Sequence, residues 1–420
     1  MERSKCMNVP KIRFKEFKEN WDNPIIDSIF ELRNGYTPSK SIKEYWENGT
    51  IPWYRMEDIR AKGNILSEAF QYITTLAIKG SGLFKPYSII LATTATIGVH
   101  AMVIADSLAN QQFTNFSIRK SLLNKYMPEF VNYAFYKIDR WSEKNTNSGG
   151  LLSVDVKSLL KEPFYTPYYN EQQKIASYFQ SLDSLIQSTS KKLASLKQIK
   201  AASLQSMFPQ EGETLPKVRF KGFEGEWDKV KLSTLGQTYS GLTGKTKEDF
   251  NFGDSLYIPF LNVLLNPQID ESNLQKVRVE NNEKQNEIHK GDILFNTSSE
   301  TPEEVGLCSV FMSDIKKVYL NSFCFGFRLF NNLVDPSYIV YLLRSQIGRK
   351  LMLVLAQGAT RYNLSKKSFL NAHIIIPTSQ QEQQKIASYF YNLDKQISLQ
   401  TQRLEKLKQI KAACLDKMFI

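Results

Sequence analysis

The sequence EQQKIASYFQSLDSLIQSTSKKLASLKQIKAASLQSMF, residues 171–208, determines how the chain is organised. It recurs at residues 382–419 with a constant offset of 211 and 23 identical positions. An upstream pair is repeated as well: PKIRFKEFKENWD begins at Pro10 and PKVRFKGFEGEWD begins at Pro216, an offset of 206. The two segments enclosed by these paired blocks have almost no sequence in common. The chain is therefore a tandem duplication in which two constant frames each enclose a variable insert.

Both copies of the block have the heptad spacing of a coiled coil. Apolar residues alternate in steps of four and three, which is the seam along which two helices wind around each other. The seam residues are Ile175, Phe179, Leu182, Ile186, Thr189, Leu193 and Leu196 in the first copy, and Ile386, Phe390, Leu393, Ile397, Gln400, Leu404 and Leu407 in the second. We predict two long helices that pair antiparallel, because each helix follows a globular insert.

Each seam contains one polar residue at the same rank, Thr189 or Gln400. In an antiparallel pair these two residues would fall opposite or nearly opposite each other, and such a polar layer can fix the register of two helices. The alternative is that both are tolerated exceptions without a role. Asn170 and Ser379 are suitable N-cap residues for the two helices.

Composition indicates a folded protein with a polyanionic partner. The chain has 420 residues, of which 42 % are hydrophobic, enough for two to three domains with substantial cores. Its 54 Lys and Arg residues exceed its 42 Asp and Glu residues, a net charge of +12 that favours nucleic acid or a membrane surface as partner. No run of 18 apolar residues is present and the first residues are strongly charged, so we expect no membrane span, no signal peptide and a cytoplasmic location.

The two inserts share a plan of a hairpin followed by a helix. In the first insert, residues 87–105 predict a hairpin and residues 122–138 an amphipathic helix; in the second, residues 291–312 and 336–355 repeat this order. The predicted fold class is α+β, with two homologous mixed α/β domains, two long antiparallel coiled-coil helices and a pseudo-twofold internal repeat. The predicted boundaries are 1–168 for the first domain, 169–208 for the first helix, 209–215 for a linker, 216–378 for the second domain and 379–420 for the second helix.

Motifs for catalysis, cofactors and metals are missing from the sequence. The heptapeptide SGLTGKT at residues 240–246 resembles a phosphate loop, but Tyr239 stands where the first glycine belongs. There is no Asn-Pro-Pro-Tyr signature of adenine methyltransferases, no glycine-rich turn for S-adenosylmethionine and no paired Cys or His spacing for zinc. We therefore predict no catalytic residue, no metal ligand and no cofactor bound by this chain.

The inserts instead contain polar and basic residues in predicted loops. Arg, Lys, Asn and Gln side chains read base edges through paired hydrogen bonds, whereas Ser and Thr hold phosphates. For any single one of these residues a solvated loop position is the commoner explanation. The candidate DNA-binding residues are Thr93, Thr94, Thr96, Gln111, Gln112, Lys144, Asn145 and Asn147 in the first insert, and Asn296, Thr297, Ser298, Ser299, Arg361, Tyr362 and Asn363 in the second.

The chain resembles the specificity subunit of type I restriction-modification systems over essentially all of its length. The resemblance is carried by the openings PKIRFKEF and PKVRFKGFEGEW, the hairpin motif GDILFNTSS at residues 291–299 with its counterpart PYSIILATT at residues 86–94, and the two junctions that contain EQQKIASYF. It implies two target recognition domains that each read one half of a split DNA sequence, while the paired helices set the gap between the halves.

The same resemblance implies partners and a role without catalysis. The helices would bind two modification subunits, which carry S-adenosylmethionine and methylate adenine at N6. Restriction subunits, which use ATP and Mg²⁺, would join them in the full complex. The tail LKQIKAA, present in both helices with apolar residues all round, is consistent with two equivalent docking sites.

Two other function classes remain open at this point. One is a self-sufficient modification or cleavage enzyme, against which the missing motifs count. The other is a structural coiled-coil adaptor without sequence-specific DNA binding, which the net charge and the polar loops disfavour.

Overall fold

The computed structural model describes residues 8–80, 82–147, 152–358 and 360–420. It divides into two compact units, unit 1 with residues 1–190 and 402–420, and unit 2 with residues 191–401. Two helices of 38 residues, α5 (Tyr169–Ser206) and α11 (Gln380–Lys417), contribute one part to each unit. The units thus differ from the sequence-based domains, which kept each helix whole.

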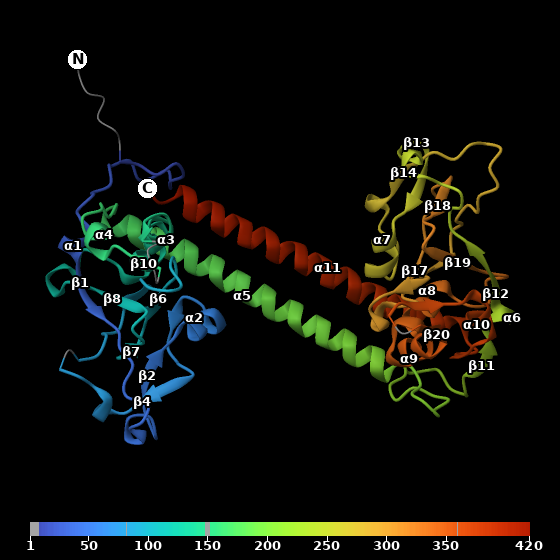
Figure 1. Ribbon diagram of the computed structural model, residues 1–420, viewed down its shortest axis with the longest axis horizontal. Helices are drawn as coiled ribbons and strands as arrows, with labels where there is room; N and C mark the ends of the chain where they lie inside the picture. The colour runs from blue at the N-terminus through green and yellow to red at the C-terminus, as the bar shows by residue number, and fades with distance from the viewer. Residues whose placement is uncertain (1–7, 81, 148–151, 359) are drawn as a thin grey trace, which may run out of the picture. The chain divides into compact units, whose positions relative to one another are not determined.

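Unit 1 is built on a five-stranded sheet with the strand order β1-β8-β5-β6-β3 among the described residues (Figure 1). Its neighbours pair antiparallel, except that β3 pairs parallel with β6. A second sheet has the order β4-β2-β7, and β9 pairs with β10. The strands are β1 (Phe30–Asn34), β2 (Ile51–Tyr54), β3 (Ile65–Leu66), β4 (Gln71–Ile73), β5 (Ser88–Ala92), β6 (His100–Val103), β7 (Leu108–Ala109), β8 (Phe113–Ile118), β9 (Thr146–Asn147) and β10 (Ser153–Val154).

The principal core of unit 1 lies between its large sheet and the helix α3 (Pro128–Lys144). Phe130, Ala134 and Ile138 recur every four residues on one face of α3 and are buried. Phe135 of the same helix packs edge to face against Phe116 of β8. The other helices of the unit are short: α1 (Ile26–Ile29), α2 (Met56–Lys62) and α4 (Val156–Leu159).

Unit 2 repeats this plan with different side chains. Its main sheet has the order β12-β19-β15-β17, which corresponds to β1-β8-β5-β6, and β14-β13-β18 corresponds to β4-β2-β7. A further sheet, β16-β21-β20, and the pair β11-β22 complete it. The strands are β11 (Asp228–Lys231), β12 (Gly236–Ser240), β13 (Phe250–Ile258), β14 (Gln275–Val277), β15 (Ile293–Asn296), β16 (Ser298–Ser299), β17 (Cys308–Val310), β18 (Val318–Leu320), β19 (Cys324–Leu329), β20 (Ala356–Gln357), β21 (Tyr362–Leu364) and β22 (His373–Ile376). The helices are α6 (Leu232–Leu235), α7 (Phe260–Leu265), α8 (Pro336–Arg344), α9 (Gln346–Leu355) and α10 (Lys366–Asn371).

The predicted hairpins are confirmed, and the predicted helices of the inserts need correction. Strands β5 with β6, and β15 with β17, are antiparallel neighbours as expected. The helix predicted at residues 122–138 begins only at Pro128, because residues 120–122 form a 3₁₀ turn. The second predicted helix is interrupted at Ser345, whose hydroxyl caps α9 by accepting a hydrogen bond from Gly348 N. Only glycine fits at position 348, since a Cβ atom there would lie 2.2 Å from the carbonyl oxygen of Leu342.

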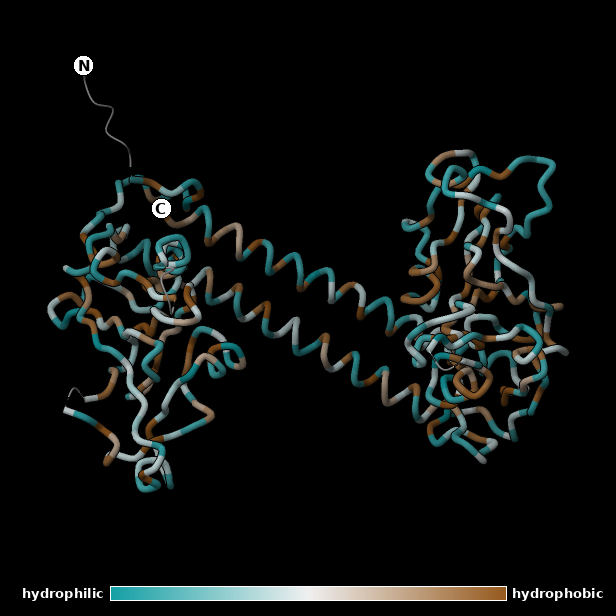
Figure 2. The backbone as a smooth tube through the Cα atoms, in the orientation of Figure 1, coloured by the Kyte–Doolittle hydropathy of each residue, from teal (hydrophilic) through white to brown (hydrophobic). Residues whose placement is uncertain are grey.

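The long helices run antiparallel within each unit, as the sequence predicted. In unit 1, Lys411 Nζ lies 2.5 Å from Asp183 Oδ1, and the Tyr178 hydroxyl lies 3.3 Å from Cys414 Sγ. In unit 2 the positions related by the offset of 211 form the equivalent contacts: Lys200 pairs with Asp394, and the Ser203 and Tyr389 hydroxyls are 2.9 Å apart. Figure 2 shows hydrophobic residues recurring between hydrophilic stretches along both helices, as the heptad spacing requires.

The two polar seam residues do not face each other. Counting along both helices from the Asp183–Lys411 pair in unit 1 places Thr189 level with Glu405. Counting from the Lys200–Asp394 pair in unit 2 places Gln400 level with Ala194. In each unit the polar residue is therefore level with a position five residues away from the other polar seam residue, so the two do not form one central polar layer.

The seam residues are the more buried positions of both helices. Of the fourteen, Ile186, Ile397, Gln400 and Leu407 are half-buried and the other ten are buried. At its ends the seam also joins the domain cores: Phe179 stacks on Phe419 in unit 1, and Phe208 stacks on Phe390 in unit 2.

The repeated opening segments tie each frame to the start of its long helix. Arg13 forms two hydrogen bonds of 2.7 Å with Glu171, and Arg219 forms two of 2.6 and 2.8 Å with Glu382. Both carboxylates are almost completely buried, with 2 % and 1 % of their surface exposed. This pairing explains why the opening and the helix are duplicated together.

The start of one long helix was predicted correctly and that of the other was not. Ser379 precedes α11, and its hydroxyl accepts a hydrogen bond from Glu382 N at 3.4 Å, as expected for an N-cap. Asn170 instead lies inside the first turn of α5, which begins at Tyr169.

Candidate nucleic-acid interface

Three loop segments of unit 1 meet at one edge of its main sheet. The segment after β5 is joined to the segment before β8 by the hydrogen bond from Thr93 N to Gln112 O, 2.9 Å. It is joined to the β9–β10 hairpin by the bond from Val154 N to Thr93 O, also 2.9 Å, and by a β-bridge between Thr94 and Ser153. Segments that are distant in the sequence thus lie next to one another at this edge.

Unit 2 builds the same edge from the equivalent segments. Thr297 N donates to Phe323 O at 3.0 Å, and Leu364 N donates to Thr297 O at 2.8 Å. Strand β16 pairs with β21, so that Ser298 lies opposite Asn363. The backbone of the edge is therefore conserved between the two units while its side chains differ.

An asparagine fixes one of the three segments in both units. The side-chain oxygen of Asn110 accepts a hydrogen bond from Gln112 N at 3.1 Å, and that of Asn321 accepts one from Phe323 N at 2.9 Å. Short polar side chains commonly bond the backbone two residues on in this way. Gln112 and Phe323 consequently occupy equivalent positions.

The structure brings together most of the candidate residues of unit 1, but with unequal exposure. Gln111, Lys144, Asn145 and Asn147 are exposed, and Thr94, Thr96 and Gln112 are half-buried. Thr93 is buried and its hydroxyl lies 3.0 Å from that of Thr114, so its contacts are internal. Asn145 uses its amide group to bond the Trp141 carbonyl oxygen at the end of α3.

Unit 2 shows the same division between exposed and internal candidates. Arg361 and Asn363 are exposed, and Thr297, Ser298 and Tyr362 are half-buried. Asn296 is fully buried and donates to the Glu304 carbonyl oxygen at 2.7 Å, and the buried Ser299 hydroxyl donates to the Glu304 carboxylate at 3.0 Å. Asn296 and Ser299 therefore hold the loop that follows β15, and their side chains are not presented to a ligand.

Two residues at these edges were missed by the sequence analysis. Thr37 donates from Oγ1 to Gln111 Oε1 at 2.6 Å, which leaves the amide nitrogen of Gln111 as its outward donor. Phe323 is 62 % exposed although it lies among polar residues. The sequence signal for Phe323 was an asparagine two residues before it, which also precedes Gln112 by two residues. A single matching residue is too little to align two dissimilar inserts.

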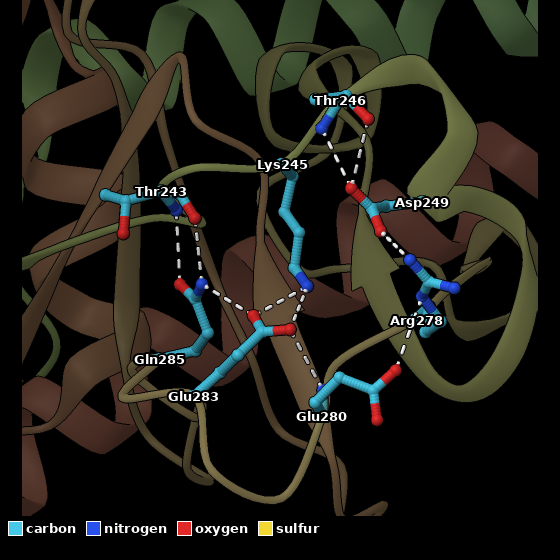
Figure 3. Close-up of polar contacts among 8 residues, drawn as sticks. All are labelled: Thr243, Lys245, Thr246, Asp249, Arg278, Glu280, Glu283 and Gln285. Atoms are coloured by element: carbon cyan, nitrogen blue, oxygen red, sulfur yellow. Dashed lines mark hydrogen bonds and ion pairs between the residues drawn. The ribbon is translucent and has the colours of Figure 1, made fainter.

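The segment that resembles a phosphate loop is closed on its own side chains. Lys245 Nζ lies 2.6 Å from Glu283, and the backbone of Thr243 bonds to Gln285, so the segment is tied to residues 280–285 (Figure 3). The bond from Lys245 is the main cause that lowers the pKa of the Glu283 carboxyl. The lysine side chain is 6 % exposed and is already paired with a carboxylate. A lysine that binds phosphate needs a charge that is accessible to the ligand.

Two further features concern the part of the chain that the structure describes. No group of three or more His, Cys, Asp or Glu side chains within that part of the chain could hold a metal ion. No helix there is long and apolar enough to cross a membrane.

Known proteins are similar to this chain along nearly its whole length. The family model described as "Type I restriction modification DNA specificity domain" matches residues 18–198 and 224–409, one match for each half of the duplication. The MjaIX specificity subunit of Methanocaldococcus jannaschii is 28 % identical over 445 aligned positions, covering 96 % of this chain and 95 % of that protein. The EcoprrI specificity subunit of Escherichia coli is 43 % identical over 136 residues, which span 32 % of this chain and 34 % of that protein.

Solved structures agree on the fold. The crystal structure of the S subunit of a type I restriction-modification system from M. genitalium superimposes with a TM-score of 0.60 at 16 % identity and covers 98 % of this chain and 99 % of its own. Because two family matches together cover most of the sequence, the chain belongs to the family of type I restriction-modification specificity subunits.

Proposed function

We propose that this chain is the DNA sequence-recognition subunit of a type I restriction-modification complex, in which each unit reads one half of a bipartite target. The observation that carries this proposal is the three-segment edge, built twice on one backbone plan but with different side chains. A conserved scaffold with exchanged surface residues is what two related sites for two different base sequences require.

The exposed side chains of the two edges suit base reading. Gln111 and Asn147 in unit 1, and Arg361 and Asn363 in unit 2, carry the amide and guanidinium donors used for direct contacts in the major groove. Arginine pairs with guanine and asparagine or glutamine with adenine, so the halves would prefer different bases. Half-sites read from the same side of a duplex lie about one turn, roughly 10 base pairs, apart from centre to centre.

The long helices are proposed to set the gap between half-sites and to dock two modification subunits. Ile199 and Ile410, equivalent under the offset of 211, are 44 % and 39 % exposed although both belong to the repeated LKQIKAA segment. Two equivalent exposed apolar positions are consistent with two copies of one partner. Those partners would carry S-adenosylmethionine and methylate adenine N6, and restriction subunits with ATP and Mg²⁺ would join them, while this chain binds no cofactor and catalyses no step.

A salt titration of duplex binding tests the function class. Phosphate contacts release counterions, so the logarithm of the binding constant should fall steeply and linearly with the logarithm of the salt concentration. A flat dependence would favour the coiled-coil adaptor instead. Methyl transfer by the purified chain alone would revive the self-sufficient enzyme.

A further inference from the structure

We propose that Phe323 is a specificity-determining residue of unit 2, which contacts the 5-methyl group of a thymine in the second half-site. This inference rests on the proposed function and adds one residue and one base to it.

The backbone of Phe323 is fixed while its side chain is free. Its N–H donates to Asn321 Oδ1 at 2.9 Å, and its carbonyl oxygen accepts from Thr297 N at 3.0 Å. The phenyl ring is nevertheless 62 % exposed. A large apolar group exposed to water gains free energy when a ligand covers it, and the fixed backbone reduces the entropy lost on binding.

The residues on the segments joined to Phe323 indicate the chemistry of its ligand. Thr297 bonds directly to it, and Thr297 in turn accepts from Leu364 N, beside Asn363 and the exposed Arg361. Polar and basic residues on the segments joined to Phe323 fit a duplex better than they fit an apolar protein surface. In the major groove the thymine 5-methyl is the apolar feature that base edges offer, and phenylalanine is among the residues that contact it.

The equivalent position in unit 1 supports a role of Phe323 in discriminating between bases rather than in folding. The equivalent position is Gln112, held by the same two backbone bonds, so the scaffold does not require an aromatic residue there. A glutamine at this position favours adenine through paired hydrogen bonds, whereas a phenylalanine favours a methyl group. The exchange would give the two halves different preferences at one corresponding base pair.

The chain also offers a matched control. Phe330 is 60 % exposed and follows β19, whereas Phe323 precedes it, so the two rings lie at opposite ends of a six-residue strand, about 20 Å apart. Phe330→Ala removes the same apolar surface without touching the proposed interface.

The experiment is a binding selection from random duplexes with the full chain and its modification subunits, for the wild type, Phe323→Ala and Phe330→Ala. Phe323→Ala should lose about tenfold in preference at one T·A pair of the second half-site and leave the first half-site unchanged. Replacing that thymine by deoxyuridine removes only the methyl group, and should weaken the wild type about fourfold but leave the binding of Phe323→Ala unaltered. Phe330→Ala should match the wild type throughout.

Two failures can be told apart. If the wild type selects a split target and Phe323→Ala selects the same target with equal stringency at each position, the inference about Phe323 is overturned and the proposed function stands. If uridine weakens the wild type and Phe323→Ala equally at every thymine, the methyl contact is also refuted. If the wild type selects no split target, the proposed function itself fails.

Discussion

The Arg219–Glu382 pair allows a quantitative test of how the frames are held together. Glu382 is 1 % exposed and accepts two hydrogen bonds from the guanidinium, which also donates to the carbonyl oxygens of Glu224 and Gly225. Breaking a buried pair by removing one partner typically costs about 3–5 kcal/mol, because a buried charge is left uncompensated. Glu382 lies in the first turn of α11, where the helix dipole offsets about 1 kcal/mol of this. We expect Arg219→Ala to lower the free energy of unfolding of unit 2 by about 2–4 kcal/mol.

Urea denaturation at 25 °C, followed by circular dichroism, measures this loss. The exposed pair of Lys290 and Asp314 is the control, and Lys290→Ala should change stability by less than about 1 kcal/mol. The double variant Arg219→Met with Glu382→Leu should recover most of the loss, since it leaves no unpaired charge. Arg13→Ala should produce a similar loss in unit 1. An Arg219→Ala variant no less stable than Lys290→Ala would refute the argument, as would a double variant no better than the single one.

Three further outcomes are expected. Deleting the level heptads 186–192 and 402–408 together removes about 10 Å of helix, so the preferred gap should shorten by about three base pairs in a binding selection, and an unchanged gap would exclude the helices as the spacer. Arg361→Ala should cost about 1–3 kcal/mol in binding and relax one position of one half-site, whereas uniform weakening on all sequences would identify a phosphate contact. Burial is the main cause that raises the pKa of Tyr133 and Tyr341, and the neighbouring carboxylates of Asp183 and Asp394 raise it further. The neutral phenols therefore stabilise the fold fully below the unfolded pKa of about 10, and this contribution decreases as the pH rises above it. Chemical denaturation between pH 8 and 11 should show this decline, and it should be shallower when both residues are Phe.

The duplication and the heptad spacing were sufficient to predict the long helices, their antiparallel pairing and the hairpins of both inserts. Their register could not be predicted, because the seam alone does not say which turns of two helices lie level. The register is visible in two ion pairs, Lys200 with Asp394 and Lys411 with Asp183. These charged residues lie just beside the seam, and in the sequence they look the same as charged residues on a solvated helix face.

The proposed recognition edges show the same limit at the level of single residues. Loop polarity selected segments that the fold joins at one edge, but it could not separate Asn363, which is exposed, from Asn296, which is buried and bonds to Glu304. The exposure of Phe323 could not be predicted, because an aromatic residue is expected in a core. Its position depends on the backbone hydrogen bonds made by Asn321 and Thr297. Tertiary contacts, and not composition, decide which loop residues meet a ligand.

Mapping N6-methylated adenine in the genome of cells that contain this chain with its modification subunits tests the central claim most directly. The account predicts one split motif with two different half-sites, a fixed gap and methylated adenines in both halves, which disappears when this chain is deleted. A contiguous motif, a variable gap, or methylation that persists without the chain would contradict it.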